Sequence, residues 1–122
     1  MVLPHANMSV LIVDDDPTCR LLSAIFLRQF GIRDITMAEN GAEAVLSCRL
    51  GITYDIIVMD FSMPLMNGVE ATKALRDMGV ESKIYAVSAD NDDALIESFR
   101  EAGANKFFNK PLNLDKVASF FV

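Results

Sequence analysis

The sequence contains no tryptophan, a single histidine and two cysteines among its 122 residues. Cys19 and Cys48 stand far apart without a neighbouring histidine, so the spacing of a zinc site is absent. We interpret both cysteines as small, half-buried apolar residues of a reducing compartment. His5 lies in an N-terminal stretch that we expect to fray, which argues against a catalytic histidine.

Long apolar segments are missing as well. No apolar run reaches the roughly 20 residues that span a bilayer, and residues 1–7 lack the basic and apolar regions of a signal peptide. We therefore expect a soluble, cytoplasmic protein without a membrane partner.

Positive charge is in short supply. Lysine and arginine number 11 against 17 aspartates and glutamates, which gives a formal net charge of −6. Direct binding to nucleic acid is not expected, because such proteins neutralise phosphates with a basic surface. The acidic balance is compatible with a cation site built from carboxylates. With 52% hydrophobic residues the chain can form a core, and its length predicts a single domain over residues 1–122.

Short apolar runs alternate with amphipathic stretches along the whole chain. The runs predict strands at residues 9–13, 35–38, 54–60, 83–88 and 106–108, with a helix after each. Asp16 and Pro17 predict the start of the first helix, and Gly31 predicts its end. Five such units predict an α/β, doubly wound parallel sheet of five strands in the flavodoxin-like order 2-1-3-4-5, flanked by five helices.

Residues capable of chemistry stand at the ends of four of the predicted strands. They are Asp14, Asp15, Asp16, Asp60, Ser88 and Lys110. Ligands of doubly wound sheets bind beyond the carboxyl ends of the strands, so we expect these side chains to meet. Clustered carboxylates repel one another unless a cation relieves them, and oxygen donors alone favour Mg²⁺ or Ca²⁺ over zinc. The glycine and glutamate spacing of a calcium loop is absent.

A carboxylate, a divalent cation, a lysine and a hydroxyl around one point indicate phosphoryl transfer. Each residue alone has an ordinary interpretation: Asp16 as a helix cap, Asp60 as a turn or capping residue, Ser88 as a strand-end hydroxyl and Lys110 as a surface lysine. Their joint placement at successive strand ends favours a common site.

Four motifs together resemble the receiver domain of two-component response regulators. The motifs are Val13-Asp14-Asp15-Asp16, Met59-Asp60-Phe61-Ser62-Met63-Pro64 with Asn67-Gly68, Val87-Ser88-Ala89, and Lys110-Pro111. The resemblance covers nearly the whole chain. The stretch from Met63 to Ala71 also looks like plant response regulators and the receivers of hybrid kinases, which would add the nucleus to the expected compartments.

The resemblance implies a phosphorelay receiver rather than an enzyme with turnover. Asp60 would accept a phosphoryl group from a histidine kinase or a His-containing phosphotransfer protein. Mg²⁺ would be held by Asp14, Asp15, Asp60 and the backbone carbonyl of Ser62. Lys110 would pair with a phosphoryl oxygen. The sequence does not identify the downstream effector.

A conformational switch is also implied by the resemblance. Ser88 and the backbone N–H of Ala89 would contact phosphoryl oxygens. Phe107, three residues before Lys110, would be the switch aromatic, although a strand phenylalanine can equally be core. The Lys110-Pro111 peptide is commonly cis in this family.

Three other functions compete with this interpretation. Asp14 and Asp16 resemble the first motif of haloacid-dehalogenase-type phosphatases, and Ser88 and Lys110 could be its second and third motifs, but Asp60 would then have no role. A flavodoxin-like binding module would need a Ser/Thr/Gly-rich phosphate loop where this chain is acidic, and nucleotide-binding glycine motifs are absent. A degenerate receiver used only for docking would not need the intact set of site residues.

Overall fold

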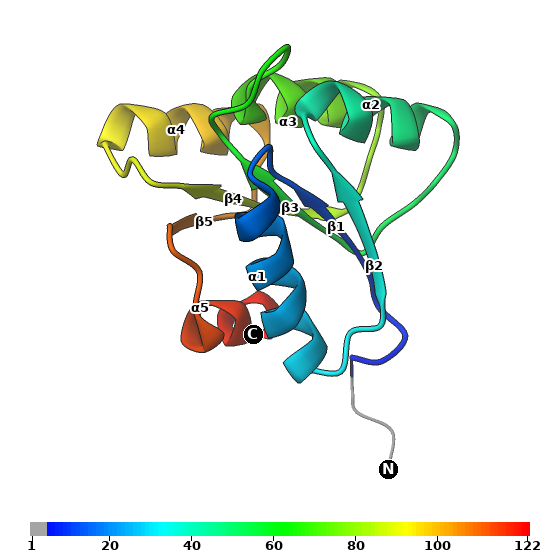
Figure 1. The fold of residues 1–122 in the computed structure, drawn as a ribbon. Helices are drawn as coiled ribbons and strands as arrows, with labels where there is room; N and C mark the ends of the chain where they lie inside the picture. Colours follow the sequence, from blue (N-terminus) through cyan, green and yellow to red (C-terminus); the bar gives the residue numbers. More distant parts are fainter. Residues whose placement is uncertain (1–4) are drawn as a thin grey trace.

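A parallel sheet of five strands forms the centre of the computed structural model, which describes residues 5–122 (Figure 1). The strands are β1 (Ser9–Val13), β2 (Asp34–Ala38), β3 (Ile56–Asp60), β4 (Lys83–Ser88) and β5 (Lys106–Asn109). Their spatial order is β2-β1-β3-β4-β5, and every neighbouring pair is parallel. The predicted doubly wound α/β fold is therefore confirmed.

Helices cover both faces of the sheet. They are α1 (Pro17–Gln29), α2 (Gly41–Arg49), α3 (Gly68–Asp77), α4 (Asp93–Ala102) and α5 (Leu114–Ala118), the last followed by a 3-10 turn at Ser119–Phe121. Figure 1 shows α1 and α5 on one face, with α2, α3 and α4 on the other. Within residues 5–122, no helix is long and apolar enough to cross a bilayer.

Each helix begins at a side chain that accepts hydrogen bonds from backbone N–H groups of the first turn, the standard way to satisfy these donors. The capping residues are Asp16, Asn40, Asn67, Asp92 and Asn113. At α3 the cap is reciprocal, because Glu70 also accepts a hydrogen bond from the Asn67 backbone. The caps fix where the chain leaves each loop for a helix.

The continuous apolar runs reflect burial on both faces of the central strands. Every residue of β3 is buried, as are four of the five residues of β1. Alternate side chains enter different cores. Leu11 and Ile57 belong to the core that includes residues of α2, α3 and α4, whereas Ile12 and Val58 pack with residues of α1 and α5.

Several boundaries differ from the predicted ones by one or two residues, and two of them have a clear physical cause. Strand β3 begins at Ile56 instead of residue 54, because the Asp55 carboxylate accepts a hydrogen bond from the Ser9 backbone N–H at 2.8 Å and so ties the turn to β1. The last helix loses its α-helical form after Ala118. There Lys106 Nζ donates to the Ser119 carbonyl and the Tyr85 hydroxyl donates to the Phe120 carbonyl.

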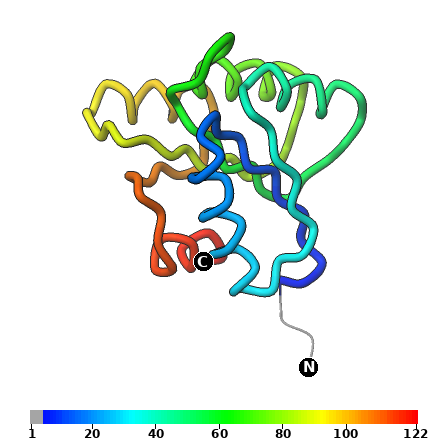
Figure 2. Tube along the Cα trace, viewed as in Figure 1, coloured from blue at the N-terminus to red at the C-terminus, as the bar shows by residue number. Residues whose placement is uncertain are grey.

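The loops that follow β1 and β3 leave the sheet next to each other, and the β3–α3 loop then rises to the top of the molecule, as the trace in Figure 2 shows. Val13 pairs with Met59 in the sheet, so the residues just beyond them are held next to each other. The pairing of β1 with β3 thus brings the aspartates that follow β1 close to Asp60 at the end of β3. They lie at the edge where ligands of such sheets bind.

Candidate functional site

Three aspartates form an acidic cluster at this edge. Asp14, Asp15 and Asp60 each contribute a carboxylate oxygen, and these oxygens all lie within 4.8 Å of one another. Asp14 and Asp60 are only 5% exposed, whereas Asp15 is open to solvent. A set of oxygen donors at this spacing, with one open side, has the chemistry that Mg²⁺ prefers in proteins.

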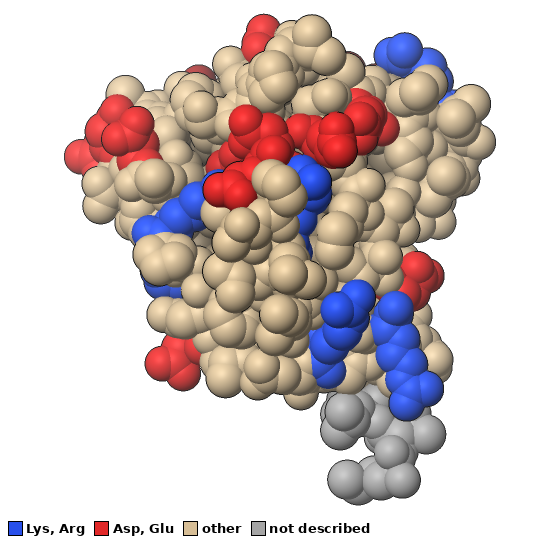
Figure 3. Space-filling model, viewed as in Figure 1, with Lys and Arg blue, Asp and Glu red and all other residues tan. Residues whose placement is uncertain are grey.

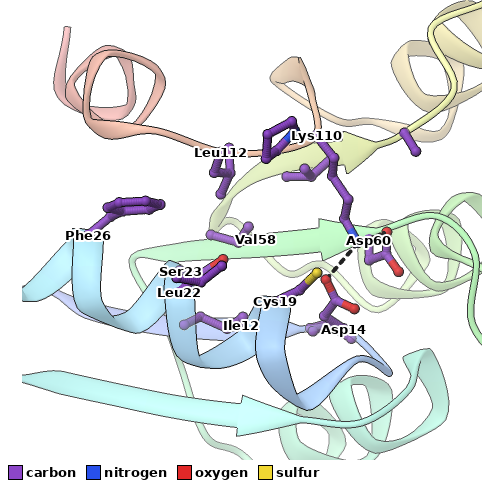
Figure 4. Close-up of a pocket in the computed structure, with 14 residues that line it drawn as sticks. Ile12, Asp14, Cys19, Leu22, Ser23, Phe26, Val58, Asp60, Lys110 and Leu112 are labelled. Atoms are coloured by element: carbon purple, nitrogen blue, oxygen red, sulfur yellow. Dashed lines mark hydrogen bonds and ion pairs between the residues drawn. The ribbon is translucent and has the colours of Figure 1, made fainter.

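Lys110 reaches the cluster from the loop after β5. Its Nζ lies 2.8 Å from Asp14 Oδ2 and 3.0 Å from Asp60 Oδ1 (Figure 4). The Lys110-Pro111 peptide is cis, as the resemblance implied. Side chains predicted from three separate strand ends therefore meet at one point.

A second lysine holds the loop that carries Lys110. Lys116 Nζ donates hydrogen bonds to the Asn109 carbonyl at 2.8 Å and to the Pro111 carbonyl at 3.1 Å, on either side of Lys110. The Lys110 N–H donates to the Ser88 carbonyl at 2.8 Å. Sequence reasoning did not single out Lys116. A lysine in the first turn of α5, six residues after Lys110, was the available signal.

Burial and neighbouring charges both shift the pKa values of Asp60 and Lys110. Burial raises the pKa of Asp60 to about 6, and repulsion from Asp14 and Asp15 adds to it, while Lys110 opposes the shift. Burial on its own would lower the pKa of Lys110. Hydrogen bonding and attraction to Asp14 and Asp60 outweigh that effect, so the pKa of Lys110 lies above its usual range. Lys110 therefore stays positively charged, and the repulsion between the carboxylates is only partly balanced.

Asp16 has a different role, at the start of α1. Its carboxylate accepts hydrogen bonds from Thr18 N at 2.8 Å and from Cys19 N at 3.4 Å, which confirms it as the cap of α1. The hydrogen bond from Thr18 lowers the pKa of Asp16. Arg20, another residue missed at first, donates to the Asp14 carbonyl and so braces the β1–α1 loop from the first turn of α1.

The two predicted switch residues, Ser88 and Phe107, lie on the neighbouring strands β4 and β5, and the predicted phosphoryl contact Ala89 directly follows β4. Ser88 is buried at the end of β4, and its Oγ accepts a hydrogen bond from Asp90 N at 3.1 Å. Ala89 lines the same cavity as Asp60. Phe107 is half-buried, with its ring centroid 6.0 Å from that of Phe99 in α4. Their proposed roles in switching stay predictions.

The β3–α3 loop is anchored directly to the end of β3. A side chain at Gly68 would place its Cβ 2.1 Å from the Asp60 carbonyl oxygen, so only glycine fits there. Gly68 N donates to the Phe61 carbonyl at 2.9 Å and closes the loop on itself. Ser62, the predicted carbonyl ligand, lies exposed within this loop, and its role stays a prediction.

An apolar cavity of about 320 Å³ opens beside the cluster, between α1 and the loop after β5 (Figure 4). Its apolar lining includes Leu22, Phe26, Val58 and Leu112. Figure 3 shows acidic side chains gathered above the start of α1. The approach to Asp60 is thus acidic at the surface and apolar on the α1 side.

The family description "Response regulator receiver domain" matches residues 10–120 of this chain. The chain belongs to the response regulator receiver family. Among curated relatives, two-component response regulator 24 of Arabidopsis thaliana is 40% identical over 96% of this receiver and 84% of that protein. The chemotaxis protein CheY of Bacillus subtilis is 32% identical over 88% and 89% of the two chains.

Solved structures agree with this assignment. The receiver domain of the Francisella response regulator 1452 matches with a TM-score of 0.84 and 27% identity over 93% of both chains. A chain in the CheX–CheY–BeF3–Mg²⁺ complex of Borrelia burgdorferi matches with a TM-score of 0.84 and 28% identity, over 94% of this receiver and 90% of that chain. The haloacid-dehalogenase alternative is not supported, because Asp16 caps a helix instead of facing the cluster.

Proposed function

We propose that this receiver, as one domain over residues 1–122, accepts a phosphoryl group on Asp60 from a phosphohistidine donor in a Mg²⁺-dependent reaction. The observation that carries the proposal is the position of Asp60: a buried carboxylate at the end of the central strand, in contact with Lys110 and beside two further aspartates. Phosphorelay signalling is the function of a receiver domain, and the contact between Asp60 and Lys110 supports that function here.

The acidic cluster fits Mg²⁺. Asp14, Asp15, Asp60 and the Ser62 carbonyl would hold the ion, and the three carboxylates supply only oxygen donors. A bound Mg²⁺ supplies neutralisation of the negative charge that a phosphoryl group brings to this acidic edge. The Borrelia complex, whose description names both Mg²⁺ and BeF3, supports the same assignment here.

The chain's own residues perform the transfer. A carboxylate oxygen of Asp60 forms a bond to phosphorus while the bond from phosphorus to the donor's imidazole nitrogen breaks, and that electron pair stays on the nitrogen. With a pKa of about 6, Asp60 is mostly ionised at neutral pH and can act as the nucleophile. The Lys110 ammonium pairs with a phosphoryl oxygen and holds it in line.

The product is an acyl phosphate on the protein itself, so the chain is a phosphoacceptor and not an enzyme with turnover. Its donor is a His-containing phosphotransfer protein or a histidine kinase. In the phosphorylated state, Ser88 and the Ala89 N–H would contact phosphoryl oxygens, and Phe107 would move into the space that Ser88 leaves. The altered surface would then bind an effector protein.

The test is incubation with a purified, phosphorylated plant His-containing phosphotransfer protein, with and without Mg²⁺, followed by intact mass measurement of both partners. We expect one phosphoryl group to move to the wild-type receiver only with Mg²⁺, and none to move to Asp60→Asn. The label should be released by base and by hydroxylamine, as an acyl phosphate is. Labelling of Asp60→Asn at the wild-type rate would overturn the proposal.

A further inference from the structure

The tip of the β3–α3 loop has an unusual backbone. Leu65 has a φ of 71°, the single positive value that a residue other than glycine adopts within residues 5–122. Met66 N donates a hydrogen bond to the Pro64 carbonyl at 2.8 Å across it. An i to i+2 hydrogen bond around a central residue of positive φ is a γ-turn of the rare, strained type. Leucine is poorly suited to this conformation, which glycine or asparagine adopts more readily.

Contacts on both sides keep the tip in this strained form. The base of the loop is closed by the hydrogen bond from Gly68 to Phe61, and Gly68 packs on the Asp60 carbonyl. On the other side, a Cβ at Gly41 would lie 2.9 Å from the Met66 carbonyl oxygen, so Met66 lies directly against the start of α2. The loop stands out at the top of the molecule, above the β1–α1 loop (Figure 1).

Nothing inside the fold requires a leucine at this tip. The Leu65 residue is 86% exposed, so it contributes little to either core. Leu50 offers a comparison: it is 72% exposed at the end of α2, but its φ of −78° is ordinary. Leu65 thus combines a strained backbone with an apolar side chain in solvent, and glycine at the same position would relieve both. Strained backbone of this kind clusters at active sites and ligand-binding segments, which points to a function for this residue.

The position of Leu65 indicates what this function is. A protein group that bonds to Asp60 has to approach over the edge where the β3–α3 loop and the start of α1 lie. Leu21 and Leu22, in the second turn of α1, are exposed apolar residues, and Leu22 lines the cavity that also contacts Asp60. The acidic cluster therefore lies between two apolar sides, one on α1 and one at the loop tip. A partner that matches this edge presents basic groups at its centre and apolar residues around them.

We propose that Leu65 is a docking residue for the phosphodonor protein, and that its side chain packs on apolar residues that flank the donor's phosphohistidine. The inference rests on the proposed function. The strained γ-turn fixes the leucine in an outward position before the donor arrives, so little conformational freedom is lost when the complex forms. Small phosphoryl donors reach Asp60 without touching the loop tip, and they provide a clean comparison.

The experiment measures phosphorylation of four variants by two donors in the presence of Mg²⁺. The donors are the phosphorylated plant His-containing phosphotransfer protein and the small molecule phosphoramidate. Leu65→Gly and Leu65→Asn remove the apolar side chain and relieve the turn. Leu65→Met keeps an apolar side chain on the same backbone, and Leu50→Asn removes another strongly exposed leucine elsewhere.

Leu65→Gly and Leu65→Asn should lower the second-order rate constant of transfer from the protein donor roughly tenfold. Both should leave the rate with phosphoramidate unchanged and raise the melting temperature. Leu65→Met and Leu50→Asn should transfer at close to the wild-type rate. Wild-type transfer by Leu65→Gly and Leu65→Asn would overturn the inference, as would an equal loss with both donors, since the loop would then act through the geometry of Asp60.

Failure of the proposed function would look different. A wild-type receiver that neither donor labels would overturn the phosphoacceptor assignment and, with it, the docking role. A receiver that both donors label, with Leu65 variants that behave as wild type, would overturn the docking role alone.

Discussion

Lys110 donates a hydrogen bond from Nζ to Asp14 Oδ2 at 2.8 Å, although the two residues are 96 positions apart in the sequence. The contact ties the loop after β5 to the end of β1. One ammonium balances only one of the three clustered carboxylates, so the edge keeps an unbalanced negative charge that suits a divalent cation. The same ammonium also competes with such a cation for the oxygens of Asp14.

Lys110→Met should therefore bind Mg²⁺ more tightly than the wild type while accepting phosphoryl groups more slowly. It should also unfold more easily, by about 2 kcal/mol, because Asp14 and Asp60 lose the cation that balances them. Magnesium titration by calorimetry and urea unfolding without metal check the two effects. Lys116→Met is the control, since it removes a positive charge from α5, beside the same loop, without removing a contact to the carboxylates. Weaker Mg²⁺ binding by Lys110→Met would contradict the prediction.

Magnesium should stabilise the wild-type fold. Millimolar Mg²⁺ should add about 1–2 kcal/mol if its concentration exceeds Kd roughly tenfold, because the ion binds the folded site and not the unfolded chain. Asp15→Asn and Asp60→Asn remove a repulsion and a ligand, so each should melt above the wild type without metal and gain much less from it. Thermal unfolding with and without Mg²⁺ measures this, with Asp90→Asn as a control outside the cluster. A wild-type melting temperature indifferent to Mg²⁺ would identify the aspartates as purely structural.

Acid should stabilise the metal-free receiver through Asp60. Burial raises the pKa of this carboxyl from 3.8 to about 6, so the folded state takes up the proton more readily than the unfolded state. The resulting stability is fully present below the unfolded pKa and is lost as the pH rises through the folded one. Between pH 7 and 5 the wild type should gain about 1 kcal/mol relative to Asp60→Asn. Parallel stability curves of the two proteins in a metal chelator would refute this.

Ser88→Ala should fold normally but respond weakly to phosphorylation. The substitution removes a strand-end hydroxyl that bonds only to Asp90 N within the described chain, so the loss of stability should be about 1 kcal/mol. Beryllofluoride and Mg²⁺ mimic the phosphoryl group, and NMR shifts around Phe107 report the change. Ser88→Thr keeps the hydroxyl and should respond as the wild type does. A full response by Ser88→Ala would remove this residue from the switch.

Thr72 offers a stability test away from the site. The residue is fully buried in α3, and its Oγ1 has no hydrogen-bond partner among residues 5–122. Replacing the unbonded hydroxyl by a methyl group should stabilise the fold, so Thr72→Val should gain about 1 kcal/mol in urea unfolding. Thr72→Ser keeps the hydroxyl and loses a methyl group, and it should be less stable than the wild type. A destabilised valine variant would show that the hydroxyl has a partner in solution.

The strands, the helices and the members of the site could be predicted because each is marked by a local sequence pattern. Buried strands such as β3 are continuous apolar runs, and α1 and α4 begin at aspartates that cap them. Strand order then brings Asp14 and Asp60 together. No local sequence pattern shows which side chain donates a hydrogen bond to which backbone carbonyl. The hydrogen bonds from Lys116 to the loop of Lys110 could therefore not be predicted.

The backbone of Leu65 escaped prediction for a similar reason. Leucine gives no sign of a positive φ, and the strain comes from neighbours on α2 and α3 that meet the loop only in the folded chain. The last helix changes from α-helix to a 3-10 turn after Ala118, and this change also depends on residues distant in sequence. Tyr85 and Lys106 donate hydrogen bonds to carbonyls of the final turn.

Both ends of the described chain lie together, away from Asp60. The His5 ring stacks on Phe121 with centroids 4.0 Å apart, and Phe121 neighbours Phe30 at the end of α1. The 13 residues of α1 place this corner roughly 20 Å from Asp16 and the site. A unit with adjoining ends on the side opposite its reactive edge can be spliced into a longer polypeptide, or fused to a fluorescent reporter, and still leave its phosphoacceptor open to the donor.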